Sequence, residues 1–215
     1  MTVEAHPRSR LLHVAVFVVG ASSLGSEIAA ARLLAPYFGA STIVWANTIA
    51  VVLLALSAGY WWGGRMADRS ASPGGLGRLL LLAAAGLAAI PFVGRPFLDL
   101  AVEALQEISA GAAAGSLVAV LVLLAGPVFV LGAVTPYALK LALHRVEDAG
   151  TVSGRLYAIS TVGSLTGTFT SALVLIPFVG TKRTLRPPAL ALAPVATPHR
   201  SRRLAPAVVA GIAAI

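Results

Sequence analysis

Long apolar stretches with few or no charged residues constrain the fold of this chain more than any other feature. They cover residues 11–36, 42–64, 76–94, 116–139 and 156–179. A helix needs about 20 apolar residues to cross the roughly 30 Å hydrocarbon layer of a bilayer. Each stretch therefore predicts one transmembrane helix, and residues 1–185 together predict an all-α, polytopic transmembrane helical bundle.

The composition also favours insertion into a bilayer. Hydrophobic residues make up 58% of the 215 positions, charged residues make up 11%, and the mean hydropathy is +0.88. Such a chain has too little polar surface to cover a water-soluble domain. The net charge of +8 comes largely from short basic clusters between the apolar stretches, whereas a nucleic-acid groove interleaves basic with aromatic residues. We therefore expect a lipid bilayer as partner and no nucleic acid.

The motifs of soluble enzymes do not occur in the sequence. It contains no cysteine, no phosphate-binding glycine loop, no zinc-protease helix and no hydrolase elbow. His13 near the first interface and His144 after the fourth span are interpreted as solvated or headgroup-facing side chains and not as metal ligands. We therefore expect no catalytic residue, no cofactor and no metal in this chain.

Several local features are predicted within this plan. The Gly-Pro pair at 126–127 is expected to distort the fourth span, residues 70–77 to form a loop, and residues 95–110 to form a separate amphipathic helix at the membrane surface. Glycine pairs at four-residue spacing, such as 59 with 63 and 163 with 167, predict close helix packing. The basic N-terminus also fits a signal peptide, but the first apolar stretch continues beyond the region where cleavage would occur.

Residues 186–215 depart from the pattern of clean apolar spans. Four prolines between positions 187 and 198 disfavour a regular sixth helix. The final apolar run, 204–215, has 12 residues, which are too few to cross a bilayer. We expect a degraded or truncated segment, with an interrupted sixth span and an incomplete seventh, produced by truncation or by a frameshift.

Lysine and arginine residues give the predicted orientation, because cytoplasmic loops carry an excess of both. With a sixth crossing between Arg186 and Arg200, eleven of these residues fall on the side of the N-terminus and four on the other side. Without that crossing the counts become eight and seven. We expect a multi-pass protein of the cell membrane with its N-terminus in the cytoplasm.

Polar residues inside the predicted spans are candidate functional residues. Glu27 lies deep in the first span, where an unpaired carboxylate is costly. Arg32 lies about 140° away around the same helix, so we expect Glu27 to find its partner on another helix. Glu27 fits a structural bond between helices or a transport or proton-relay role, and Arg32 fits a side chain that reaches the membrane surface. Asn47 in the second span is predicted to hydrogen-bond between helices.

The motif Gly-Arg-Met-Ala-Asp-Arg at residues 64–69 is predicted to form a cytoplasmic loop after the second span. Its residues Gly64, Asp68 and Arg69 resemble the turn between the second and third helices of major facilitator transporters. In that interpretation Asp68 pairs with basic residues or caps a helix and so biases a rocking interface. The alternative is a basic topological anchor that contains one acidic residue.

Four stretches together resemble the membrane-embedded N-terminal part of fused major facilitator/spermidine synthase-like proteins. They are SSLGSEIAAARLLAPYFGASTIVWAN (22–47), GYWWGGRMADR (59–69), GAVTPYAL (132–139) and GRLYAISTVGSLTGTFTSALVLIPFVGTKRTL (154–185). The resemblance implies a longer protein, in which a soluble Rossmann-like domain transfers an aminopropyl group from decarboxylated S-adenosylmethionine to putrescine.

This sequence has no counterpart of that domain's glycine-rich cofactor loop or acidic polyamine-binding residues, so we do not expect the aminopropyltransferase activity of these residues. The leading interpretation is the membrane domain of such a fusion protein, with an anchoring, regulatory or transporter-like role toward a polyamine or another small solute. The alternative is a free-standing small transporter component of major-facilitator type. The expected partners are further copies of the chain or a separately encoded synthase domain.

Overall fold

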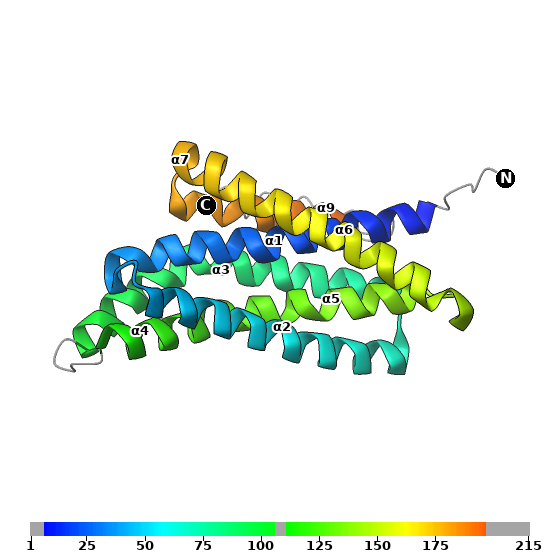
Figure 1. The fold of residues 1–215 in the computed structure, drawn as a ribbon, viewed down its shortest axis with the longest axis horizontal. Coiled ribbons are helices and arrows are strands. Elements are labelled where there is room, and N and C mark those ends of the chain that lie inside the picture. The colour runs from blue at the N-terminus through cyan, green and yellow to red at the C-terminus, as the bar shows by residue number, and fades with distance from the viewer. Residues whose placement is uncertain (1–6, 106–110, 197–215) are drawn as a thin grey trace.

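The computed structural model describes residues 7–105 and 111–196, which form helices joined by short connections (Figure 1). The elements are α1 (Pro7–Phe38), α2 (Thr42–Ser70), α3 (Pro73–Leu105), α4 (Gly111–Val120), η1 (Leu121–Ala125), α5 (Gly126–Ala142), η2 (Val146–Asp148), α6 (Ala149–Phe169), η3 (Thr170–Leu175), α7 (Ile176–Val179), α8 (Thr181–Thr184) and α9 (Arg186–Val195).

Five helical stretches of the described residues are long and apolar enough to cross a membrane. They are Arg10–Phe38, Thr42–Ser70, Pro73–Glu103, Gly111–Ala142 and Val146–Val179. Each contains one of the predicted spans completely. The predicted all-α bundle with five spans is therefore confirmed, and the protein is a multi-pass membrane protein.

The connection between the second and third spans is shorter than the sequence predicts. Because α2 continues to Ser70 and α3 begins at Pro73, the prediction of a loop at 64–69 is wrong, and the loop predicted at 70–77 shrinks to two residues. Ser72 Oγ accepts a hydrogen bond at 3.0 Å from the backbone N–H three residues later and so caps α3. Proline then occupies the first helical position, where its missing N–H costs nothing.

The amphipathic segment after residue 95 is the last part of α3 and not a separate helix, so that prediction is wrong. α3 continues through two prolines to Leu105. Leu98 is fully buried, while the acidic residues Asp99 and Glu103 are exposed. The apolar side of the segment therefore packs on the bundle. Residues 106–110 of the predicted segment lie outside the described residues.

Two of the spans contain a π-helical segment. In the fourth span η1 lies directly before the Gly-Pro pair at 126–127, where the sequence predicts a distortion, because a proline cannot donate the regular helical hydrogen bond. In the fifth span η3 lies in the same way directly before Ile176 and Pro177, a proline that the sequence analysis did not single out. Two glycines with positive φ, Gly39 at 78° and Gly180 at 86°, end α1 and α7 in a conformation that side chains disfavour.

Beyond Gly180 the chain folds back along the bundle and forms α8 and α9. α9 packs against α1 and α3 and buries Ala189 and Leu192. The described part of the predicted degraded segment is thus a packed helix, because its first two prolines lie in the first turn, where proline is tolerated. The 10 residues of α9 measure about 15 Å, half of the hydrocarbon layer. Residues 197–215 lie outside the described residues.

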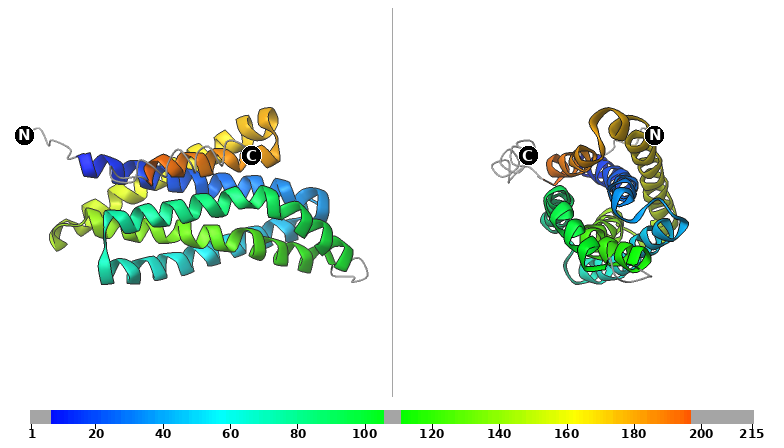
Figure 2. Two further views of the ribbon diagram at one scale, coloured as in Figure 1. Left: turned by 180° about the vertical axis from the view of Figure 1, so that it is seen from behind. Right: turned by 90° about the vertical axis from the view of Figure 1, so that its left-hand side faces the viewer.

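Four of the spans form two pairs of parallel helices. α1 packs along α6 and runs in the same direction, while α2 packs along α5 and both run in the opposite direction (Figures 1 and 2). α3 contacts α5, and α9 contacts α1 and α3. The helices α1, α2 and α3 therefore have counterparts in α4–α5, α6–α7 and α9. We call these two sets the first half and the second half, and the second half is inverted relative to the first.

Equivalent glycine contacts join the helices of the two parallel pairs. In each pair, two glycines on one helix lie against the backbone carbonyls of a phenylalanine and an alanine on the other helix. They are Gly59 and Gly63 against Phe129 and Ala133, and Gly163 and Gly167 against Phe17 and Ala21. The prediction that these glycine pairs allow close packing is confirmed.

The sequence repeats at these contacts. Residues 11–21 (LLHVAVFVVGA) and 123–133 (LLAGPVFVLGA) are identical at seven of the eleven positions. Phe17 thus corresponds to Phe129, a shift of 112 residues, and Gly59 corresponds to Gly163, a shift of 104 residues. A shift of 112 residues therefore relates each residue of α1 to its equivalent in the fourth span. A shift of 104 residues relates each residue of α2 to its equivalent in the fifth span.

Candidate functional site

Glu27 lies near the middle of α1, which has the largest buried fraction of the five spans. Its side chain is half-buried. In the part of the chain that the structure describes, Glu27 forms neither an ion pair nor a hydrogen bond. The partner that the sequence predicts on another helix is therefore not found among these residues, and the carboxyl group is free to bind a proton or a cation.

Ser23 lies one helical turn before Glu27 on the same face of α1. It is 6% exposed, and its Oγ has no hydrogen-bond partner among the described residues. The neighbouring Ser26 is also buried, but its hydroxyl donates to the carbonyl oxygen of Ser23 at 2.8 Å. Because buried hydroxyl groups are almost always paired, the free hydroxyl of Ser23 adds a second polar group to the site.

The other two intramembrane candidates differ from Glu27 in their surroundings. Arg32 is exposed and makes no ion pair with Glu27 in the described chain. Asn47 Nδ2 donates to Ala113 O and to Ser116 Oγ, both at 2.9 Å. These bonds join α2 to α4, so the predicted interhelical hydrogen bond of Asn47 is confirmed.

The motif at residues 64–69 forms the last turns of α2. Asp68 Oδ1 pairs with Lys140 Nζ of α5 at 2.8 Å, and both side chains are largely exposed. The pairing of Asp68 with a basic residue agrees with the sequence interpretation, while Arg69 is exposed. Gly64 has room around it, since a β-carbon there would lie 3.9 Å from Pro136.

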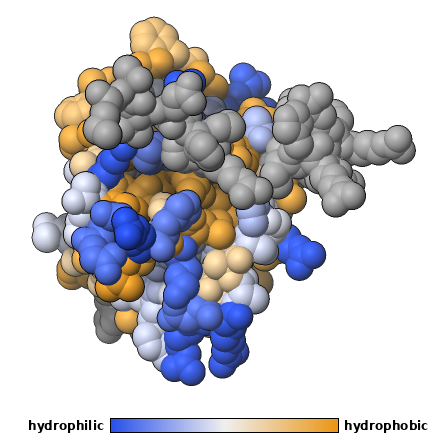
Figure 3. All heavy atoms as spheres, turned by 90° about the vertical axis from the view of Figure 1, so that its right-hand side faces the viewer, coloured by the Kyte–Doolittle hydropathy of each residue, from blue (hydrophilic) through white to orange (hydrophobic). Residues whose placement is uncertain are grey.

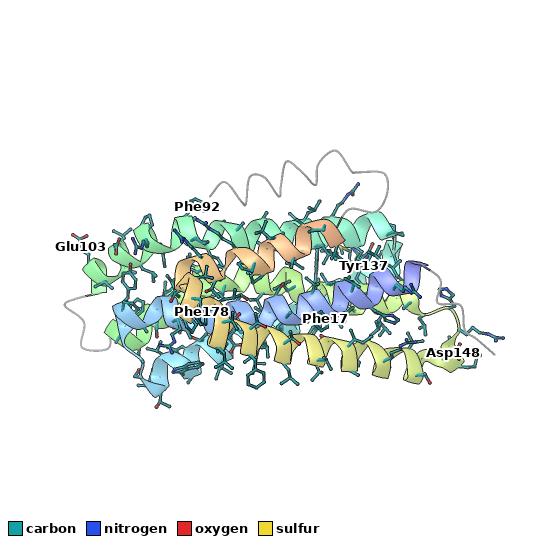
Figure 4. The ribbon with its side chains drawn as sticks, turned by 90° about the horizontal axis from the view of Figure 1, so that it is seen from above. Phe17, Phe92, Glu103, Tyr137, Asp148 and Phe178 are labelled. Carbon is teal, nitrogen blue, oxygen red and sulfur yellow. The ribbon has the colours of Figure 1, made fainter. Side chains whose placement is uncertain are left out.

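Tyr137 holds the short connection that follows this motif. Its hydroxyl accepts a hydrogen bond from the N–H of Ser72 at 2.9 Å and donates to the carbonyl of Ser70 at 3.1 Å. The ring is buried between α3 and α5 near the end of the bundle (Figure 4). This tyrosine and the Asp68 ion pair therefore fasten the ends of three spans together.

These groups belong to the end of the bundle at which α1 begins, which we call the basic end. Exposed cationic side chains at this end are Arg10, Arg65, Arg69, Arg78, Lys140, Arg145 and Arg155. Figure 3 shows this end with hydrophilic groups around an apolar centre. A ring of charges around an apolar interior is typical of a bundle that meets headgroups and water there.

A cavity of about 220 Å³ lies between α1, the region of α6 and η3, and α9. Its lining consists of Phe17, Val18, Ala21, Ser22, Thr166, Gly167, Thr170, Ser171, Leu175, Pro187, Pro188 and Ala191. The sequence analysis did not anticipate this cavity, because its walls come from three segments whose pairing the sequence does not reveal.

Among residues 7–105 and 111–196, no three His, Cys, Asp or Glu side chains gather in a way that could hold a metal ion. Comparison of the chain with family models, with curated proteins and with solved structures gives no match. The functional argument therefore rests on the site itself.

Proposed function

We propose that this chain is a transporter-type unit of the cell membrane that binds a small cationic solute at Glu27. The observation that carries the proposal is a carboxyl group in the middle of a span without an ion-pair or hydrogen-bond partner in the described chain. Ionisable residues at such depth commonly mark ion or solute pathways. Inverted halves like those of this bundle are a common architecture of transporters, which bind their solutes near the bilayer midplane.

The chemistry of the site favours an amine over an anion. A carboxylate accepts charge-assisted hydrogen bonds from an ammonium group, and the free hydroxyl of Ser23 adds an acceptor one turn away. Binding of a cation also neutralises a charge that is costly in a low-dielectric environment. The resemblance to the membrane part of spermidine synthase-like proteins makes putrescine and spermidine the first solutes to test.

The charge distribution supports an N-terminus in the cytoplasm, because the basic end carries most of the exposed cationic residues. Reporter fusions after Arg69, after Asp99 and after Arg145 would test this orientation. A cytoplasmic reporter after Asp99 together with external reporters after the other two positions would refute it.

The low burial of α2 and α6 favours a second candidate function. These two helices bury the smallest shares of their residues among the five spans. In this alternative the chain is one component of a transporter that is completed by further copies, and α2 and α6 meet those copies. Cysteine pairs placed on exposed positions of α2 and α6 would cross-link between copies in the membrane if the alternative is correct.

Uptake of labelled putrescine into proteoliposomes tests the main proposal. The Glu27→Gln variant is expected to lose at least nine-tenths of the uptake, because it keeps the size of the side chain and removes its charge. Glu103→Gln is the matched control, since Glu103 is an exposed carboxylate at the end of α3, and it should transport normally. Equal uptake by the wild type and Glu27→Gln would remove Glu27 from the mechanism.

A second measurement does not depend on the choice of solute. Hydrophobic carbodiimides modify carboxyl groups that are protonated within membranes, and mass spectrometry locates the adduct. We expect Glu27 to be modified and putrescine to protect it. Modification of Glu27 that putrescine does not slow would contradict an amine site at this residue.

A further inference from the structure

The residues that line the cavity beside α1 can be compared with their equivalents in the first half of the bundle. In the first half, Trp62 of α2 packs on Phe129 of α5, with ring centroids 5.4 Å apart and an interplanar angle of 40°. In the second half, Phe17 of α1 is the equivalent of Phe129 and lines the cavity (Figure 4). The equivalent of Trp62 is Thr166, which lines the same cavity. The cavity thus lies where the first half places an indole ring.

Two further substitutions between the halves enlarge this space. Thr170 of η3 is the equivalent of Met66 in α2, and Ser22 of α1 is the equivalent of Val134 in α5. Both Thr170 and Ser22 line the cavity. At these positions the second half has a smaller or more polar side chain where the first half has a larger apolar one.

Two of the four hydroxyl-bearing residues of the lining donate to backbone carbonyls. Thr166 Oγ1 donates to the carbonyl of Val162 at 2.8 Å, and Ser22 Oγ donates to the carbonyl of Pro188 at 3.5 Å. The accessible lining of the cavity consists mainly of carbon atoms. Thr166 and Thr170 are exposed, so the cavity opens at the surface of the bundle, and an apolar space of this kind suits a compact aromatic molecule.

We propose that the cavity is a binding site for a small neutral aromatic molecule, whose ring packs on Phe17 as the ring of Trp62 packs on Phe129. Aromatic rings prefer tilted or offset arrangements at centroid distances of about 4.5 to 7 Å, and the Trp62 pair shows that this framework accommodates one. The site is separate from Glu27, and this proposal is independent of the solute that Glu27 binds.

Binding of 5-fluoroindole to the full chain in detergent micelles, followed by fluorine NMR, tests the proposal. The wild type is expected to bind the probe saturably. Thr166→Trp introduces the residue of the first half and should weaken binding at least tenfold, because the new side chain fills the cavity. Thr161→Trp is the matched control, since Thr161 is exposed on the same helix and does not line the cavity, and it should bind like the wild type.

Two further variants keep the test decisive if Thr166→Trp fails to fold. Thr170→Met also introduces the first-half residue and should weaken binding, and Phe17→Leu removes the ring that the probe packs on and should do the same. Absence of saturable binding to the wild type would refute the proposal, as would equal binding to the wild type and a folded Thr166→Trp or Thr170→Met variant. Binding that is seen only after removal of co-purified lipid would assign the cavity to an acyl chain and would also overturn it.

Discussion

Replacement of Gly63 by alanine tests the close packing of α2 on α5. A β-carbon at position 63 would meet three backbone atoms of Ala133, all of them nearer than side-chain carbons come to backbone atoms in proteins. The two helices must therefore separate by about 1 Å to restore ordinary contact distances of about 3.5 to 4.0 Å. A gap of that size removes roughly a quarter to a half of the attraction of each atom pair across the contact.

The expected magnitude is the difference between two opposing effects. Overpacking of a close contact costs about 1 to 3 kcal/mol, while alanine in place of glycine inside a helix contributes about 1 kcal/mol of stability. The difference between these two effects predicts that Gly63→Ala lowers the free energy of unfolding by up to about 2 kcal/mol. Gly64→Ala is the matched control, because its β-carbon would lie 3.9 Å from Pro136, and it should be neutral or slightly stabilising.

Reversible unfolding in mixed micelles with a rising fraction of sodium dodecyl sulfate measures both variants. Gly167→Ala provides an independent replicate, because its β-carbon would meet backbone atoms of Ala21 in the equivalent contact of the second half. We expect it to behave like Gly63→Ala. If Gly63→Ala were as stable as Gly64→Ala, the close approach of α2 and α5 would be refuted. A Gly167→Ala variant that behaved unlike Gly63→Ala would refute the equivalence of the two pairs.

Three further substitutions test individual contacts. Asn47→Leu removes two interhelical hydrogen bonds and should lower the free energy of unfolding by about 0.6 to 1.7 kcal/mol; an unchanged value would contradict those bonds. Tyr137→Phe removes the bonds to Ser70 and Ser72, so limited proteolysis should cleave this connection faster than in the wild type. Asp68→Asn breaks an exposed ion pair and should change stability by less than about 1 kcal/mol, with the difference vanishing at high salt.

The existence of the five spans could be predicted because it depends on local composition alone. Hydropathy reports where the chain enters and leaves the hydrocarbon layer, but it does not report where a helix ends. The second span shows the difference, since the apolar run stops near residue 64 and α2 continues to Ser70. Ala67 is buried in this extension, and Asp68 pairs with α5, so tertiary contacts extend the helix beyond the apolar run.

The candidate site was predictable only in part. The depth of Glu27 follows from its place in the first apolar run. The absence of a partner for it among residues 7–105 and 111–196 depends on which side chains the other helices turn toward α1. The repeat between residues 11–21 and 123–133 is readable from the sequence, yet it gives no position for a cavity. That position requires the parallel pairing of α1 with α6 and the return of α9 along α1.

The differences between the halves separate the residues of the two proposed sites from structural ones. Gly59 and Gly63 have glycine equivalents in the other half, and these positions hold helices together. Glu27, by contrast, corresponds to Leu139, and Thr166 corresponds to Trp62. In both cases an apolar residue occupies the equivalent position in the first half or the second half. The fold itself therefore requires neither a carboxylate at position 27 nor an open space beside position 166. Departures from local packing rules that lower stability are expected at functional sites, which is why the experiments above concentrate on these two positions.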